Sequence, residues 1–258
     1  MSFARIVVPE VLDGLPADDP DAQRSRRDLH RVHRVMGSRG IVSRALRSLP
    51  SSLPLLPNAR PMRILELGAG DGSLMLGVAR SLQDEWGKVS LTLLDFHNLL
   101  SEATTASYAA VGWEVRAQVG DVLNWADGEG KSEAVDGLPH DAPHWDLIVA
   151  NLFLHHFQTP QLSTILAAAA VRSQHFFACE PRRARLALVG SHLIGALGVN
   201  AVTREDAVLS VRAGFRDNEL SQCWPANELG WTLSEYSAGL FSHCFIASRA
   251  REPNSESR

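Results

Sequence analysis

The chain has 258 residues, of which 45% are hydrophobic and 21% charged, and its formal net charge is −4. This composition is ordinary for a globular protein, and the length suffices for one large α/β domain with an appendage. A negative charge gives no general attraction for nucleic acid, which basic domains usually bind. No stretch approaches the roughly 20 apolar residues of a membrane span, and the start MSFARIVVPE meets a proline and an acid too early for a secretory signal. We therefore expect a cytoplasmic protein without a membrane span.

Residues 1–60 precede the first predicted strand, and we expect them to form an N-terminal helical cap. Apolar residues within 29–36 have the spacing of one helix face, and four prolines between 50 and 61 mark a linker. Eight arginines lie between positions 24 and 47, with Asp28 as the only acid among them. They could bind an acidic carrier protein, a CoA-type phosphate or nucleic acid. We favour the alternative, a solvated face on a helix whose apolar side covers a substrate pocket.

Five hydrophobic runs of strand length follow the linker. Four of them are mostly apolar on both alternating faces, as in strands buried between two helical layers. Helix-permissive segments separate the runs at 72–84, 98–110 and 161–171. Because a strand with its helix takes about 30 residues, this repeat predicts a doubly wound, mostly parallel sheet of an α/β protein. The runs are MRILEL (62–67), SLTLLD (90–95), WEVRAQV (113–119), WDLIVA (145–150) and HFFACE (175–180).

The pattern changes after the fifth run. Helical sequence RARLALVGSHLIGAL and a second helix at about 203–213 lead to two strand candidates, WTLSEYSAG and FSHCFIASR. Only a few residues separate these two, so they should pair as an antiparallel hairpin. The sequence thus predicts a seven-stranded sheet in one domain at 61–250, with a disordered tail at 251–258. The acidic, Gly/Pro-bearing segment 126–144 should be a surface insertion.

The three cysteines give no sign of a metal site or a disulfide framework. Cys179, Cys223 and Cys244 are widely spaced, and no CxxC pair exists. We therefore predict no structural metal from the cysteines.

The segment ILELGAGDGS (64–73) carries the clearest functional signal. A buried strand runs into a glycine turn and then into a helix, whose N-terminus directs free N–H groups at a ligand. Gly68 and Gly70 let the backbone approach that ligand closely. Such a loop holds either a dinucleotide or S-adenosylmethionine (SAM). Ser73 stands where the dinucleotide fingerprint has its third glycine, and Glu66 would face a cation but repel a pyrophosphate.

This segment resembles the first motif of the class I SAM-dependent methyltransferases, a hydrophobic run followed by E/D-x-G-x-G-x-G. Asp95 resembles the acid that holds the ribose hydroxyls of SAM, and Asp121 the acid that reaches the adenine amino group. As an alternative, Asp121 caps a helix. WDLIVANLFLHHF resembles the fourth motif, which borders the methyl group. The resemblance covers roughly residues 60–250 and implies that SAM is held by Glu66, Gly68, Gly70, Asp95, Phe96, Asp121, Val122 and Asn151.

Within this family, ANLFLHHF is most similar to the small-molecule biosynthetic branch, which includes quinone-biosynthesis and polyketide-tailoring enzymes. The sequence lacks the Asp/Asn-Pro-Pro-aromatic signature of methylation on nucleobases and glutamine. The resemblance implies methyl transfer to oxygen or carbon of a small, largely apolar metabolite, such as an aromatic or polyketide-derived one. The alternatives are an NAD(P)-dependent oxidoreductase, an RNA or protein methyltransferase that uses the arginine-rich helix, and a non-catalytic binding protein.

Candidate catalytic and substrate residues follow the fourth and fifth strands. His155 or His156, with His156 favoured, should act as a general base or orient the acceptor, because neutral imidazole suits that role near neutral pH. Alternatively, one of the pair packs or bonds to the backbone. We expect no metal here, since no motif places a third ligand. Glu180, Arg182 and His192 are candidate substrate contacts, with a salt-bridged helix start as the alternative for the arginine.

Overall fold

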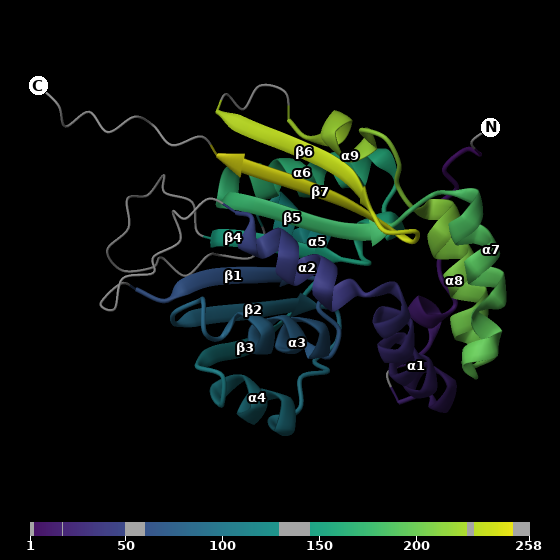
Figure 1. Cartoon of the computed structure of the whole chain (residues 1–258), viewed down its shortest axis with the longest axis horizontal. Coiled ribbons are helices and arrows are strands. Elements are labelled where there is room, and N and C mark those ends of the chain that lie inside the picture. The colour runs from purple at the N-terminus through teal and green to yellow at the C-terminus, as the bar shows by residue number, and fades with distance from the viewer. Residues whose placement is uncertain (1–2, 17, 50–59, 129–144, 226–229, 250–258) are drawn as a thin grey trace, which may run out of the picture.

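The computed structural model contains a seven-stranded sheet between helical layers (Figure 1). It describes residues 3–16, 18–49, 60–128, 145–225 and 230–249. The predicted tail and most of the predicted insertion lie outside these residues. The strands are β1 (Met62–Leu67), β2 (Val89–Asp95), β3 (Trp113–Val119), β4 (Trp145–Asn151), β5 (Ser173–Pro181), β6 (Trp231–Ala238) and β7 (Ser242–Arg249).

The strand order is β3-β2-β1-β4-β5-β7-β6. The first five of these strands run parallel, whereas β7 is antiparallel to both β5 and β6. The prediction of a doubly wound sheet that ends in an antiparallel hairpin is therefore confirmed. The chain reverses its direction across the sheet between β1 and β4. Beyond the carboxyl ends of the strands at such a switch point, α/β proteins bind their ligands.

Two hydrophobic clusters fill the faces of the sheet. The cluster of α2, α3 and α4 takes Ile64 from β1, and the cluster of α5, α6 and α9 takes its neighbour Leu65, because successive strand residues point to opposite faces. The helices are α1 (Pro20–Met36), α2 (Ser38–Arg47), α3 (Ser73–Leu82), α4 (Glu102–Ala109), α5 (Val122–Asp127), α6 (Thr159–Arg172), α7 (Arg185–Leu193), α8 (Ala201–Ala213) and α9 (Glu219–Cys223).

β3 is the run whose sequence is least apolar, and the structure explains why. It lies at the edge of the sheet, and only Trp113 among its residues is buried. An edge strand has one neighbour and can leave polar side chains in solvent.

The N-terminal helical segment is divided rather than continuous. Gly37 has a left-handed backbone, with φ of 69°, and it separates α1 from α2. Val42 and Leu46 of α2 are buried in the same cluster as Ile64. The predicted cap at 1–60 therefore needs revision, because α2 packs as part of the sheet domain. The arginines are likewise spread over two helices.

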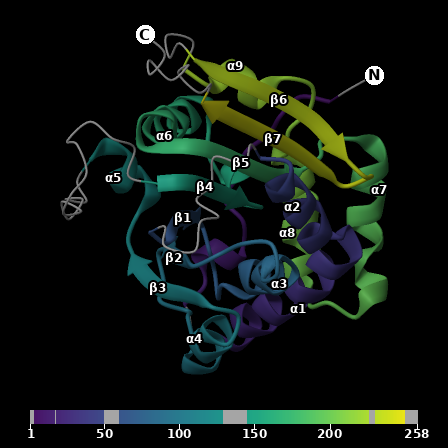
Figure 2. The ribbon, with the colours of Figure 1, turned by 60° about the vertical axis from the view of Figure 1, so that its left-hand side comes forward.

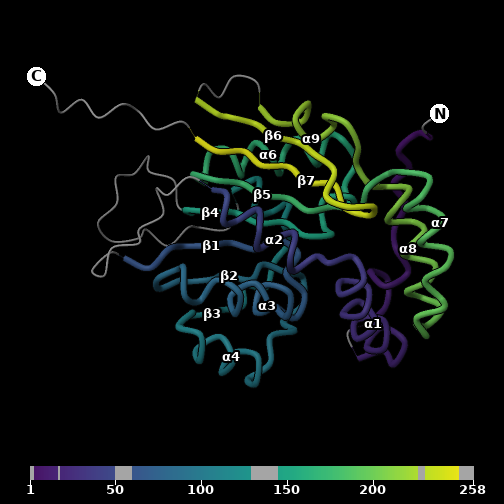
Figure 3. Tube along the Cα trace, in the orientation of Figure 1, coloured from purple at the N-terminus to yellow at the C-terminus, as the bar shows by residue number. Residues whose placement is uncertain are grey.

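Three helices gather beyond the carboxyl ends of the parallel strands. Figures 1 and 2 show α1, α7 and α8 together at this end, with α8 in contact with both others. The N-terminal arm, residues 3–16, runs beside α8 before it reaches α1 (Figure 3). These segments enclose a space next to the carboxyl ends of the parallel strands.

Among the helices that the structure describes, none is long and apolar enough to cross a membrane.

Candidate active site

A cavity of about 680 Å³ lies at the switch point of the sheet. One end is formed by the carboxyl ends of β1, β2 and β4 with the glycine loop. The other end lies under α1, α7 and α8 and is mostly apolar. The apolar end is lined by Leu29, Val32, Met36, Leu193, Ile194 and Val211.

Among the residues that the structure describes, two buried acceptor atoms at the sheet end of the cavity have no hydrogen-bond partner. They are Oε2 of Glu66, near the end of β1, and Oδ1 of Asn151, at the end of β4. Burial, with the negative charges of Asp71 and Asp95, raises the pKa of Glu66 well above its ordinary value. A buried acceptor without a donor is costly, and a carboxylate more so. This end of the cavity therefore fits a ligand that carries positive charge and N–H donors.

Gly68 and Gly70 of the glycine loop both line the cavity, but a side chain at each would meet different surroundings. Both have left-handed backbones, with φ of 64° at Gly68 and 57° at Gly70. A Cβ atom on Gly68 would lie 2.1 Å from the Phe153 ring, whereas one on Gly70 would meet no atom within 4 Å. The missing side chain at Gly68 makes room for Phe153, whereas Gly70 faces the open cavity, and the ligand contacts of both glycines stay a prediction.

Asp95 and Phe96 form the side of the cavity at the end of β2. The two carboxylate oxygens of Asp95 accept hydrogen bonds from the backbone of Gly70, at 2.9 Å, and of His97, at 3.1 Å. The neighbouring Phe96 side chain lines the cavity and is 60% exposed. A fixed acid beside an open aromatic face suits a nucleoside, because the ring can stack on the base while the acid accepts from hydroxyls.

Asp121 has the structural role that the sequence left open as an alternative. Its Oδ1 accepts a hydrogen bond of 2.8 Å from the backbone of Leu123 and caps α5. Gly120 and Val122 on either side line the cavity. The adenine contact of Asp121 stays a prediction.

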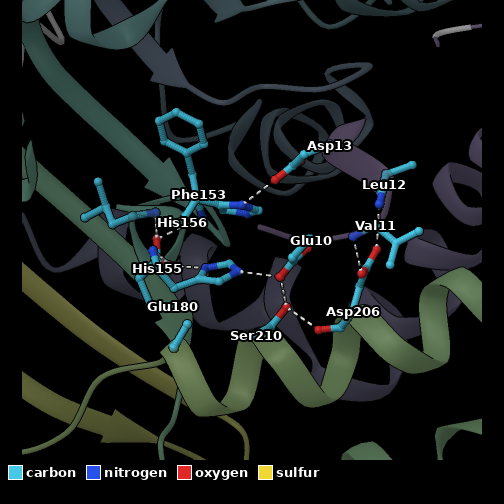
Figure 4. Close-up of polar contacts among 12 residues, drawn as sticks. Glu10, Val11, Leu12, Asp13, Phe153, His155, His156, Glu180, Asp206 and Ser210 are labelled. Atoms are coloured by element: carbon cyan, nitrogen blue, oxygen red, sulfur yellow. Dashed lines mark hydrogen bonds and ion pairs between the residues drawn. The ribbon is translucent and has the colours of Figure 1, made fainter. Parts of the chain in front are cut away.

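His155 is buried between two carboxylates (Figure 4). Its Nδ1 lies 2.8 Å from Oε2 of Glu180, and its Nε2 lies 3.3 Å from Oε1 of Glu10. Burial alone would lower the pKa of His155, but the hydrogen bonds and charges of the two acids outweigh it and raise the pKa to about 9. In this arrangement both ring nitrogens are occupied at neutral pH. His155 therefore has no free lone pair to receive a proton from an acceptor.

The three predicted substrate contacts do not lie on the cavity wall. Glu180 is fully buried and accepts hydrogen bonds from the backbone of Phe153, at 3.1 Å, and Leu154, at 3.0 Å, so it holds the loop after β4. Arg182 bonds to a carbonyl of the β6–β7 turn. His192 is exposed on the outer side of α7. These placements give Glu180 a supporting role and leave the other two outside the site.

His156 also lines the cavity. Its Nδ1 lies 2.9 Å from Oδ2 of Asp13, and 22% of its side chain is exposed. When Nδ1–H donates to Asp13, the imidazole keeps the lone pair of Nε2 for another partner. Of the two histidines, His156 is the one that can act on a ligand directly.

Comparisons with known proteins identify the fold. No protein-family model matches the sequence, and no curated protein sequence matches it significantly. The plantazolicin methyltransferase BpumL, crystallised with a monoazolic desmethylPZN analog and SAH, matches over 90% of this chain and 91% of that chain, with a TM-score of 0.54 and 14% identity. The SAM-dependent methyltransferase SibL matches over 93% of this chain but only 61% of its own, with a TM-score of 0.51 and 16% identity. The chain has the Rossmann-like methyltransferase fold.

On this methyltransferase fold, α8 holds the N-terminal arm over the site (Figure 4). The Asp206 carboxylate accepts hydrogen bonds from the backbone of Val11, at 2.7 Å, and Leu12, at 3.1 Å. Ser210 donates its hydroxyl to Glu10. The acids of the arm are not predictable from the sequence, because no periodicity or motif marks them. Their only signal is that two acids interrupt the otherwise apolar stretch IVVPEVLDGL.

α1 covers the cavity of the methyltransferase fold and contacts its glycine loop. The two ring nitrogens of His30 lie 3.2 Å from Oγ of Ser73 and 3.3 Å from Oδ2 of Asp71. One turn further, His33 lines the cavity, and burial with the nearby His30 lowers its pKa to about 4. The helix thus closes the apolar end while it touches the loop at the other end.

Proposed function

We propose that the chain is a SAM-dependent methyltransferase that acts on oxygen or carbon of a small, largely apolar metabolite. The observation that carries the proposal is the buried carboxyl group of Glu66, whose Oε2 has no hydrogen-bond partner among the described residues and which lines the cavity beside the glycine loop. The ammonium group of SAM is cationic and carries N–H donors, so it would provide the hydrogen-bond partner that this carboxyl group lacks. BpumL, which shares the fold, was crystallised with SAH. An NAD(P) cofactor is not favoured, because its pyrophosphate would meet Glu66.

The residues of the sheet edge would hold the cofactor. Glu66 and Asn151 would receive its amino group, and Asp95 with Phe96 its nucleoside. When bound, SAM supplies a methyl carbon whose bond to sulfur breaks, with its electron pair going to sulfur, as the acceptor's oxygen or carbon forms the new bond and loses a proton. We propose the following cofactor-binding set: Glu66, Gly68, Gly70, Asp95, Phe96, Asp121, Val122 and Asn151.

The chain's own contribution to the reaction is positioning. The apolar wall under α1, α7 and α8 excludes water and holds the body of the acceptor. His156 would contact the reacting group of the acceptor, and the hydrogen bond between Asp13 and Nδ1 holds the imidazole ring in place. We propose that the acceptor is a small molecule and that no nucleic acid is needed as a partner. A carrier protein that presents this small molecule is compatible with the proposal. A cytoplasmic location is part of the same proposal.

Substitution His156→Ala should lower kcat by about 10² or more and leave SAM affinity within about threefold. The imidazole contacts the acceptor end of the cavity, whereas the cofactor end keeps all its residues. Steady-state kinetics and calorimetry with SAH measure the two effects separately. A variant with near wild-type kcat would show that His156 is structural.

Substitution Asp95→Ala should weaken SAM binding by about 2–3 kcal/mol, which lies within the range of about 1.5–3 kcal/mol for hydrogen bonds to a charged group. It removes the acceptor for ribose hydroxyls and also releases the Gly70 N–H. Acceptor affinity should stay nearly unchanged. The matched control is Asp84→Ala, an exposed acid that does not line the cavity. Equal losses for cofactor and acceptor in calorimetry would contradict the assignment.

The proposed function is tested without knowing the acceptor. The full-length chain is incubated with methyl-labelled SAM and a metabolite extract, and the products are separated by mass. We expect label in small apolar metabolites and micromolar binding of SAH, with no binding of NADH. Label that enters only protein or RNA would favour the macromolecular alternative, and absence of SAH binding would overturn the proposal.

A further inference from the structure

We propose that Glu10, His155 and His156 form a binding site for a divalent metal ion of the zinc type. One ligand atom from each residue lies within 4.8 Å of the others. The carboxylate comes from the N-terminal arm and the two imidazoles from the loop after β4, so the site forms where the arm docks (Figure 4). All three residues line the cavity.

The spacing of two of the ligand atoms already suits one ion. At zinc–ligand distances of about 2.0–2.2 Å, neighbouring ligand atoms of a tetrahedral site are about 3.4 Å apart. Nε2 of His155 and Oε1 of Glu10 are 3.3 Å apart. A cation would replace the proton that joins these two atoms.

Each imidazole is supported from behind by a carboxylate. Glu180 lies 2.8 Å from Nδ1 of His155, and Asp13 lies 2.9 Å from Nδ1 of His156. Histidine ligands usually donate their second ring N–H in this way, which fixes the ring and directs the lone pair of Nε2 at the metal. Ser210 similarly donates to Glu10. Six side chains thus form an arrangement in which three offer ligand atoms and three hold those ligands in place.

The donor set selects the class of metal. Two imidazole nitrogens and one carboxylate oxygen suit Zn²⁺ and its first-row neighbours, whereas Mg²⁺ and Ca²⁺ prefer oxygen ligands throughout. Three carboxylates surround the two histidines, which gives the cluster the negative charge that a cation requires. Three protein ligands also leave one coordination position open, as in catalytic zinc sites.

The role of the ion rests on the proposed function and narrows its substrate class. Because all three ligand residues line the cavity, a hydroxyl oxygen of the metabolite would reach the open position from the cavity and become the fourth ligand. A bound cation makes such a hydroxyl more acidic and fixes its position. The hydroxyl would release its proton to solvent water as it binds the cation, and its oxygen would then form the bond to the methyl carbon, while the lone pair of His156 stays on the cation. The metabolite would therefore be methylated on oxygen rather than carbon.

The test titrates the metal-free, full-length chain with Zn²⁺ and, separately, with Co²⁺. We expect one Zn²⁺ per chain and a visible absorption band for Co²⁺, with no competition from equimolar Mg²⁺. Glu10→Gln and His156→Ala should each weaken Zn²⁺ binding at least about 100-fold, and Asp13→Asn about 10- to 100-fold. Substitution of the exposed His192 by alanine is the matched control and should leave binding unchanged.

SAH binding and circular dichroism on the same samples show that each variant is folded. Absence of stoichiometric Zn²⁺ binding to the wild-type chain, or unchanged binding in Glu10→Gln and His156→Ala, would overturn the inference. A chain that binds SAH but no zinc would refute the metal site alone. A chain that binds zinc but no SAH would keep the site and refute the proposed methyl transfer.

Discussion

Substitution Gly70→Val should reduce the affinity for SAH at least about 100-fold while the chain stays folded. The space where its Cβ would lie is open for 4 Å and belongs to the cavity, so the valine methyl groups would occupy the path of the ligand. The left-handed backbone at φ of 57° adds strain, for which non-glycine residues cost of order 1–3 kcal/mol. Calorimetry with SAH and thermal unfolding measure the two effects.

The variant Gly112→Val is the control that measures the effect of backbone strain without any loss of space for the ligand. Gly112 also has a left-handed backbone, with φ of 78°, and a Cβ atom there would likewise meet no atom within 4 Å, but this glycine lies outside the cavity. The variant should lose stability and keep SAH affinity. If both valine variants bound SAH equally well, the glycine loop would not be the cofactor site.

Two N-terminal deletions should differ sharply. Removal of residues 1–37 takes away the arm and α1 but leaves the glycine loop and Asp95. The shortened chain should fold and bind SAH, yet lose at least about 100-fold in methyl transfer, because the pocket opens to water and Asp13 is gone. Circular dichroism measures folding, calorimetry measures SAH binding, and label transfer measures the methyl-transfer activity.

Removal of residues 1–59 should instead unfold the domain. It also deletes α2, whose Val42, Ala45 and Leu46 are nearly inaccessible to solvent, as is Leu49 just beyond it. Burial of a valine or leucine side chain contributes about 1.5–3 kcal/mol, and a whole domain is stable by only about 5–15 kcal/mol. Equal stability of the two deletions would mean that α2 belongs to the cap, as the sequence suggested.

The parts of the structure that the sequence predicted are those encoded locally. The strands between helical layers are apolar on both faces, as Ile64 and Leu65 illustrate by packing in opposite clusters. The short link between the last two strands allows only an antiparallel pair. The glycine loop and Asp95 follow strand ends that the topology brings to one edge. In each case a few residues that are neighbours in the sequence are enough to predict the structural feature.

The parts that the sequence could not predict depend on distant contacts. Glu10 and Asp13 reach the histidines only because the arm docks on α8, and no pattern within the arm encodes that docking. The crowding of Gly68 by Phe153 joins two loops far apart in the chain. Glu180 lies at the carboxyl end of β5, where a substrate contact is expected, but the backbone of the loop after β4 donates hydrogen bonds to its carboxylate.

The way in which the arm is attached has a consequence for access to the cavity. None of residues 3–16 is buried, and polar contacts such as that between Glu10 and Ser210 close a loop of 200 residues. Segments with little buried apolar surface open locally at a small fraction of the global unfolding free energy. The sheet and both of its clusters stay intact when this segment detaches. Local unfolding of the arm would therefore open the cavity to an acceptor and a product at a cost well below that of global unfolding.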